Sequence, residues 1–349
     1  MSDIVLGELT CPSGELVVVD AGYLGLWSGA GSPADVDAGI DLPPATDLEV
    51  VGPDAESVAR SFDRQAGTTL YDIPDRNAAE FTAMFDRHCA EHGLDARLAP
   101  TPRRPHRERA RRAASRGGEQ FIVHGVPCVA IGGVPTDRAL PVIARRTDFG
   151  PPIGENWHSF RVPFADPDSP VAGRRPLGVV GVDHARVLFG DADALSSWEH
   201  EHPADGRADV AFWGRDAQEA VRVHGAGPLD RPGEQGVFGW ADLPLDEARQ
   251  RATAVLRWAD ESPDRRLAVD FRPHSDHFRL MERIRAVPTE AGTVTVGGAR
   301  LVGAMTGYGD GLFPVELEHD RDGAPSGIRV LFADPDHLER FADFLRRHA

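Results

Sequence analysis

The fold of this chain is set by the stretch Gly292-Thr-Val-Thr-Val-Gly-Gly-Ala-Arg-Leu-Val-Gly-Ala-Met-Thr-Gly-Tyr-Gly-Asp-Gly-Leu-Phe-Pro-Val-Glu-Leu-Glu-His319. Apolar and β-branched runs in it are separated by two clusters of turn residues, Gly297-Gly298 and Gly309-Asp310-Gly311. Glycine reaches the positive φ angles that two-residue hairpin loops need, and Asp-Gly is one of the strongest short-range hairpin signals. The stretch therefore predicts three short strands joined by tight turns.

Similar patterns of strand, corner and strand occur elsewhere in the chain, at 16–24 and 181–189, and they echo 296–302. Two interpretations stay open, repeated hairpin units or chance, because such hairpins are generic. Helices are expected between the strands, among them 76–92, with Asp75 as its cap, and about 276–285 after Ser275. The predicted class is an α+β fold of antiparallel β-meanders with peripheral helices.

The composition changes abruptly at 100–119, a segment that carries seven arginines and almost no apolar residue. Like-charge runs without core residues rarely fold, so the segment is predicted to be a solvated linker. The alternative is a local arginine patch, 103–116, for phosphate or an acidic partner. Either interpretation separates an N-terminal α+β module, 1–99, from a C-terminal α+β domain, 120–349.

The charge and the residue types exclude several classes of function. All 38 basic residues are arginine, so mechanisms that need a lysine, such as Schiff-base chemistry or a phosphate-loop lysine, are excluded. A formal net charge of −17 argues against a general nucleic-acid binder, which needs a positive face. The same charge favours a basic protein partner.

The sequence also predicts a cytoplasmic protein without a membrane segment. Cys11, Cys89 and Cys128 are far apart and form no CxxC pair, so neither a disulfide framework nor a thiolate zinc site is indicated. The N-terminus lacks the basic and apolar regions of a signal peptide, and no apolar run approaches the length of a membrane span.

The best candidate site is Asp270-Phe-Arg-Pro-His-Ser-Asp-His277, at a predicted junction between a strand and a helix. His274 and His277 are three residues apart at a helix start and can share a face, so with Asp270, Asp276 or Asp310 they could hold a divalent metal. Asp270 or Asp310 would then act as a ligand or general base of a hydrolase or lyase. The alternative is an ordinary helix cap formed by Ser275, without chemistry.

Further candidates for binding are Arg272, Trp213 and Arg215. Phe212 and Trp213 are consecutive in a predicted strand and point to opposite faces, so one is expected in the core and the other at a surface or groove. For Gly309-Asp310-Gly311 a structural turn is the competing interpretation, because aspartate caps its own turn.

The two ends of the chain resemble a bacterial domain family of unknown function. Thr306-Gly-Tyr-Gly-Asp-Gly-Leu-Phe-Pro-Val315 is similar to its terminal Gly-Asp-Gly-x-(Tyr/Phe)-Pro-Val hairpin, with Tyr308 where tryptophan is usual. Pro12-Ser-Gly-Glu-Leu-Val-Val-Val-Asp20 is similar to its opening strand. The resemblance covers about a fifth of the chain and supplies no catalytic residues. It implies a β-rich α+β fold and a bacterial immunity or accessory protein.

Two functions follow as expectations. The first is a non-enzymatic cytosolic binding protein, an immunity or accessory factor acting on a basic protein partner. The second is a metal-assisted hydrolase or lyase that uses His274 and His277. A cavity in which the candidate side chains converge with an open ligand position would favour the enzyme. Side chains that are dispersed, or bonded to other groups of the protein, would favour the binding protein.

Overall fold

A computed structural model describes residues 2–36, 43–62 and 67–348. The chain forms two compact units, which we call unit 1 (Met1–Trp198 with Thr295–Ala349) and unit 2 (Glu199–Val294). Their sheets are built from antiparallel pairs with helices at the side, so the predicted α+β class is confirmed. This division differs from the predicted boundary at 100–119, because both ends of the chain contribute to unit 1.

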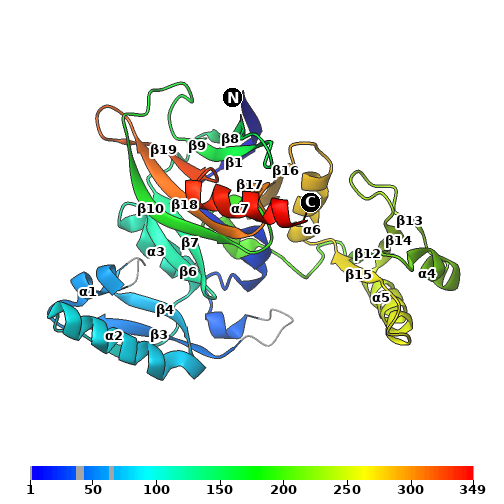
Figure 1. Cartoon of the computed structure of the whole chain (residues 1–349), viewed down its shortest axis with the longest axis horizontal. Helices are drawn as coiled ribbons and strands as arrows, with labels where there is room; N and C mark the ends of the chain where they lie inside the picture. The colour runs from blue at the N-terminus through cyan, green and yellow to red at the C-terminus, as the bar shows by residue number, and fades with distance from the viewer. Residues whose placement is uncertain (1, 37–42, 63–66, 349) are drawn as a thin grey trace. The chain divides into compact units, whose positions relative to one another are not determined.

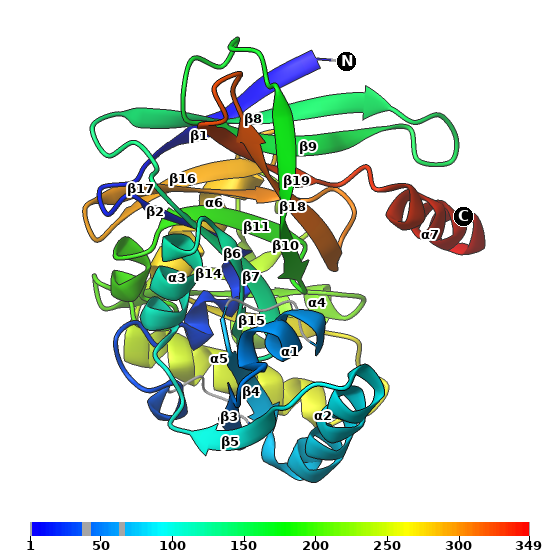
Figure 2. The ribbon, with the colours of Figure 1, turned by 90° about the vertical axis from the view of Figure 1, so that its left-hand side faces the viewer.

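The first sheet of unit 1 contains strands from both ends of the chain. Its order is β1 (Ser2–Thr10), β8 (Ala139–Asp148), β9 (Glu155–Pro163), β19 (Pro325–Leu331), β18 (Gly311–His319) and β10 (Gly173–Val182). Figure 2 shows β8, β9 and β19 side by side. One face is apolar and fully buried, with Val142, Phe160 and Val330 among its residues. This alternation of buried and exposed residues is typical of an antiparallel sheet with one solvated face.

The second sheet of unit 1 has the order β17 (Ala299–Met305), β11 (Arg186–Asp191), β2 (Glu15–Asp20), β7 (Val126–Gly132) and β6 (Glu119–Val123). Beside β17 lies β16 (Ala291–Val296), whose last two residues belong to unit 1. Strands β1 and β10 of the first sheet pack on β17 and β7 of the second. The apolar residues between the two sheets form the main core.

A smaller layer of unit 1 has the order β4 (Thr69–Pro74), β3 (Ala45–Val51) and β5 (Arg97–Thr101). Helices α1 (Ala55–Phe62) and α2 (Ala78–His92) lie beside it (Figure 1) and share a core with it around Leu70 and Phe85. The helix predicted at 76–92 is thus confirmed, except that its first residues form a 3-10 turn, Asp75–Asn77. Gly93 ends it in the left-handed conformation, with φ of 65°.

The arginine-rich segment is folded, which corrects the prediction of a solvated linker. Residues His106–Ser115 form helix α3, which packs on β6 and β7. Ala110 and Ala113 are fully buried, and so is the side chain of Arg109. The composition of the segment did not reveal this, because small alanines let the helix approach the sheet closely while the arginines bond to carboxylates from other strands.

The stretch 292–319 forms the three predicted strands, but they do not make one meander. Gly297 and Gly298, with φ of 53° and 82°, turn β16 into β17 as a hairpin. In contrast, β17 and β18 belong to different sheets, so the turn at Gly309 crosses from one sheet to the other. Thr306 fastens it, since its hydroxyl donates a 2.7 Å hydrogen bond to the carbonyl of Gly309.

The three echoing stretches fold differently from one another. After β2, the first continues as a 3-10 helix, Ala21–Leu26, instead of a second strand. The second joins β10 to β11 across the two sheets of unit 1, and the third is the hairpin of β16 and β17. Of the two interpretations left open by the sequence, these outcomes favour chance. The described chain ends with helix α7 (Pro335–His348).

Unit 2 is a four-stranded sheet with helices. Its order is β13 (Gly227–Pro228), β14 (Phe238–Pro244), β12 (Arg207–Trp213) and β15 (Ala268–Pro273). Helices α4 (Ala217–His224) and α5 (Leu245–Asp260) pack on the face that carries Val210 and Phe212. The helix predicted at about 276–285 is α6 (Asp276–Arg285), and the hydroxyl of Ser275 caps it by accepting a hydrogen bond from the amide of Phe278.

None of the helices in the described residues combines the length and the apolar composition that crossing a bilayer requires.

Candidate functional site

Three predicted site residues share one face of the sheet in unit 2. Ala211 and Trp213 of β12 lie opposite Asp270 and Ala268 of β15. Because alternate residues of a strand point to the same face, Asp270 and Arg272 face the same side as Trp213. The indole of Trp213 is 40% exposed. Asp270, Arg272 and Trp213 thus lie on the face opposite α4 and α5, and Trp213 is the exposed member of the pair Phe212 and Trp213.

Arg272 is the centre of a partly buried ion cluster. Its Nε donates a 2.6 Å hydrogen bond to Asp270, and its Nη1 donates to Glu234. Glu234 also accepts from Arg285. Burial by itself would lower the pKa of Arg272, but the hydrogen bonds to Asp270 and Glu234 raise it above its ordinary value. Arg272 therefore stays charged at neutral pH.

The start of α6 is hydrogen-bonded to a segment that is distant in the sequence. The amide of Asp276 donates to the carbonyl of Glu199 over 2.9 Å, and the amide of Glu199 donates to the carboxylate of Asp276 over 3.1 Å. This reciprocal pair brings the imidazole of His200 onto that of His277, with ring centroids 4.2 Å apart. His200 and its neighbour Glu201 carry no local signal in the sequence, because only the fold brings them beside α6.

A cavity of about 180 Å³ lies between β15, α6 and the segment that begins at Glu199. It is lined by the polar side chains of His200, Glu201, Asp270, Arg272, His277 and Arg285 and by the apolar side chains of Phe278 and Met281. Apolar walls with a few convergent polar groups are typical of ligand pockets. The predicted Asp270, Arg272 and His277 are thus brought together.

The charged side chains of the cavity form an ion cluster with Glu234, which does not line the cavity, and this cluster contains more acidic than basic groups. This cluster contains three carboxylates, those of Glu201, Asp270 and Glu234, and two guanidinium groups, those of Arg272 and Arg285. Burial and the neighbouring charge of Asp270 raise the pKa of Glu201. On the other side, burial and the charge of Arg272 lower the pKa of Arg285. The cluster has one negative charge more than its arginines neutralise.

His274 is held away from the cavity by two carboxylates. Its Nδ1 is 3.0 Å from Asp205 and its Nε2 is 3.0 Å from Asp209, and the ring stacks on Phe278. Asp209 is fully buried and also contacts Arg231 at 2.6 Å. Both imidazole nitrogens are therefore engaged, and a metal could bind His274 only by displacing a carboxylate.

The remaining predicted residues, Asp310 and Arg215, are bonded to other groups of the protein. Asp310 belongs to unit 1, where its carboxylate accepts a 3.0 Å hydrogen bond from the amide of Ala185. Arg215 forms an exposed 3.0 Å ion pair with Asp216. Among the described residues, no group of three or more His, Cys, Asp or Glu side chains is arranged to hold a metal ion.

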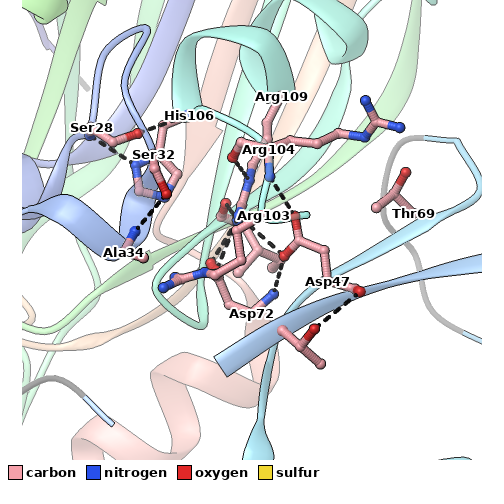
Figure 3. A network of polar contacts seen from close by, with 12 residues as sticks. Ser28, Ser32, Ala34, Asp47, Thr69, Asp72, Arg103, Arg104, His106 and Arg109 are labelled. Carbon is pink, nitrogen blue, oxygen red and sulfur yellow. Dashed lines mark hydrogen bonds and ion pairs between the residues drawn. The ribbon is translucent and has the colours of Figure 1, made fainter. Parts of the chain in front are cut away.

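Unit 1 contains a buried ion network that the sequence did not predict (Figure 3). Arg109 of α3 donates hydrogen bonds to Asp47 of β3 and to Asp72 of β4, the latter over 2.6 Å. Arg103 also donates two hydrogen bonds to Asp72. Burial would raise the pKa of Asp72, but the bonds and charge of Arg109 hold it far below its ordinary value. The network fastens the three-stranded layer to α3.

A histidine pair lies next to this network. Nδ1 of His106 accepts a hydrogen bond from the amide of Ser28, and the ring lies 5.1 Å from that of His124. Burial and the charge of Arg109 hold the pKa of His106 well below 6.5, and burial also lowers the pKa of His124. Both imidazoles are therefore neutral at pH 7. In the sequence, the spacing of Ala110, Ala113 and Ala114 is the signal that could have indicated a buried face on α3.

Comparison of the chain with models of known families, with curated proteins and with solved structures finds no match. The resemblance at the two chain ends stays a prediction.

Proposed function

We propose that this chain is a non-enzymatic binding protein and that the cavity face of unit 2 accepts a basic segment of a protein partner. The observation that carries the proposal is the convergence of Glu201 and Asp270 on one cavity, where the carboxylate of Glu201 forms no ion pair with an arginine among the described residues and lies 3.9 Å from Nε2 of His200. A guanidinium or ammonium group from the partner would balance that charge. The net charge of −17 would attract such a partner over long range.

Trp213 supports the same partner chemistry. Its exposed ring lies on the cavity face, diagonally across the strand pair from Asp270. Diagonal neighbours in a sheet are close enough for an aromatic side chain to share a ligand with a carboxylate. An arginine or lysine that binds Asp270 could therefore also contact the indole face through a cation–π interaction.

The non-enzymatic interpretation rests on His274. In the cavity of a metal-assisted hydrolase this imidazole would be a ligand, whereas here it bridges Asp205 and Asp209. Elemental analysis of the purified protein tests this directly. A near-stoichiometric metal that is lost in the His274→Ala/His277→Ala variant, with the fold retained, would replace the proposal by the hydrolase or lyase. We extend the proposal to a cytosolic immunity or accessory factor on the resemblance of the chain ends.

The binding test uses a fluorescently labelled oligoarginine peptide and the full chain, followed by anisotropy. We expect binding that weakens with salt and is at least about tenfold weaker in Glu201→Gln, which removes an exposed carboxylate without breaking a buried ion pair. Asp246→Asn is the matched control, because Asp246 is an exposed carboxylate of α5 outside the cavity. Equal affinities for wild type, Glu201→Gln and Asp246→Asn would show that only net charge attracts the peptide, and would overturn the assignment of the site.

A further inference from the structure

Four arginines gather on the solvated face of the first sheet of unit 1. Arg161 of β9 lies directly opposite Arg329 of β19. Arg145 of β8 is opposite Ser159, two residues from Arg161, and so points to the same face. Arg174 of β10 reaches this face as well, as its contact with Glu318 below shows. In an acidic protein, this is a local concentration of positive charge.

The centre of the cluster is the fully buried carboxylate of Glu318. Nε of Arg161 lies 2.5 Å from Oε2, Nε of Arg329 lies 2.9 Å from Oε1, and Arg174 is 3.5 Å away. Gly327 lies opposite Glu318, and a Cβ there would be 2.8 Å from the carbonyl oxygen of Val162 and 3.2 Å from Cα of Pro163. The glycine therefore lets β19 lie close to β9, whose Arg161 reaches Glu318.

The two carboxylates of Glu318 and Glu316 do not neutralise the three guanidinium groups of Arg161, Arg174 and Arg329. Like charges directly opposite one another destabilise a sheet, so the pair of Arg161 and Arg329 has an energetic cost. Burial lowers the pKa of Arg329, and the charges of Arg174 and Arg145 lower it further, against the attraction of Glu318. The pKa of His158 is also lowered, first by burial and then by the positive charges of Arg329, Arg145 and Arg174. The cluster is positive at its centre.

Among the four arginines of this face, Arg174 has the most hydrogen-bond donors available to a ligand. Its side chain is 46% exposed, and its nearest carboxylate contacts, Glu318 and Glu316, are 3.5 and 3.8 Å away. Within the described part of the chain it makes no hydrogen bond. By contrast, Arg145 holds Asp3 through two bonds of 2.8 and 2.9 Å. Arg174 can therefore turn its guanidinium group to an incoming anion by giving up only two ion pairs of 3.5 and 3.8 Å and no side-chain hydrogen bond within the described residues.

We propose that this arginine face is a binding site for a phosphate group, with Arg174 as the direct contact and Arg161 and Arg329 supplying the positive field. Guanidinium groups recognise phosphate through two parallel hydrogen bonds. A phosphate carries about 1.5 to 2 negative charges and three acceptor oxygens, more than a second carboxylate would bring. The site lies in unit 1 and is independent of the function proposed for unit 2.

The test compares Arg174→Gln with Arg175→Gln by isothermal titration calorimetry of the full chain, with phenyl phosphate at constant ionic strength. Arg175 is the matched control, because it is the next residue, carries the same charge, and bonds to the carbonyl of Gly117 instead of Glu318. We expect saturable binding to wild type and to Arg175→Gln, and at least tenfold weaker binding to Arg174→Gln. No saturable binding to wild type, or the same affinity in both variants, would overturn the proposal.

A second titration identifies the source of the phosphate. A phosphoserine peptide that binds more tightly than phenyl phosphate would place the group on a partner protein, and equal affinities would place it on a small molecule. Both outcomes support the site. If the unphosphorylated peptide bound as well as the phosphorylated one, the site would not be specific for phosphate and the proposal would fail.

Discussion

Arg109 in unit 1 and Arg272 in unit 2 are both buried guanidinium groups held by two carboxylates, but their surroundings differ. Arg109 is wholly enclosed, and its donors bond to Asp47, Asp72 and two backbone carbonyls. Arg272 lines a cavity, shares Glu234 with Arg285, and bonds to a carboxylate that is 39% exposed. The enclosed network joins elements of the fold, whereas the open one has groups that can exchange partners with a ligand.

The largest effect is expected from Arg109→Leu. The substitution leaves Asp47 fully buried without its cation and Asp72 with Arg103 alone, and breaking a buried ion pair from one side costs about 3–5 kcal/mol. Denaturant unfolding would measure it, with Arg111→Leu, at an exposed position of the same helix, as the control. Equal losses in the two variants would show that the network contributes no more than surface charge does.

A smaller loss is expected from Arg272→Gln. Glu234 keeps Arg285 and Asp270 is partly solvated, so each carboxylate retains a partner or water. We expect a decrease of about 1–3 kcal/mol in the free energy of unfolding, the cost of a lost charged hydrogen bond. Arg279→Gln, at an exposed arginine of α6, serves as the control. A loss as large as that of Arg109→Leu would remove the distinction between the open and the enclosed cluster.

The histidines beside the enclosed network predict a pH dependence. The pKa of His106 is lowered in the folded state, so the unfolded chain binds more protons below 6.5, and stability falls as the pH drops below that value. One such group contributes a slope of about 1.4 kcal/mol per pH unit, and His124 adds to it. His106→Asn, whose amide oxygen can still accept from Ser28, should remove one such slope between pH 6.5 and 5.

His202→Asn is the control for that measurement, because its side chain is 80% exposed. Unfolding curves of the two variants at several pH values would be compared with wild type. A slope for His106→Asn that equals the wild-type slope would mean that His106 does not take up the proton on unfolding.

The smallest effect is expected from Glu201→Gln. Burial and the charge of Asp270 raise the pKa of Glu201, so its ionised form is disfavoured in the folded protein. Replacing it by a neutral side chain should therefore leave the free energy of unfolding unchanged or raise it by up to about 0.5 kcal/mol at pH 7. Thermal unfolding against Asp246→Asn measures the difference. A loss above about 1 kcal/mol would show that Glu201 is a structural partner and not a binding group.

Much of the candidate site was predictable because its residues are close in the sequence. The strand that ends near Phe271, the cap at Ser275 and the helix from Asp276 follow from local propensity. Local pattern also identified Asp270, Arg272 and Trp213 as candidates. It gave no sign of the two partners of His274, because Asp205 and Asp209 lie in a segment more than sixty residues earlier.

The larger arrangement could not be predicted in this way. The strands of 292–319 were expected to follow one another through tight turns, yet β17 and β18 belong to different sheets, because β17 pairs with β11 and β18 pairs with β10 and β19. Seven arginines in 103–116 indicated solvent exposure, and the fold buried Arg109 because two aspartates from β3 and β4 were positioned to receive it. An unpaired arginine is expected to stay in water, because burying its charge is costly. A buried carboxylate that pairs with the arginine offsets this cost.

By itself, the sequence determined the strands of 292–319, the helices at 76–92 and 276–285, the acidic charge, the absence of lysine and the local cap at Ser275, because backbone propensity and side-chain chemistry act over a few residues. The tertiary structure decided which carboxylate neutralises which arginine, and so made Arg109 a structural residue, His200 and Glu201 part of a cavity, and Arg174 an exposed cation. Electrostatic and packing energies depend on distances between groups far apart in the chain, and only folding sets those distances.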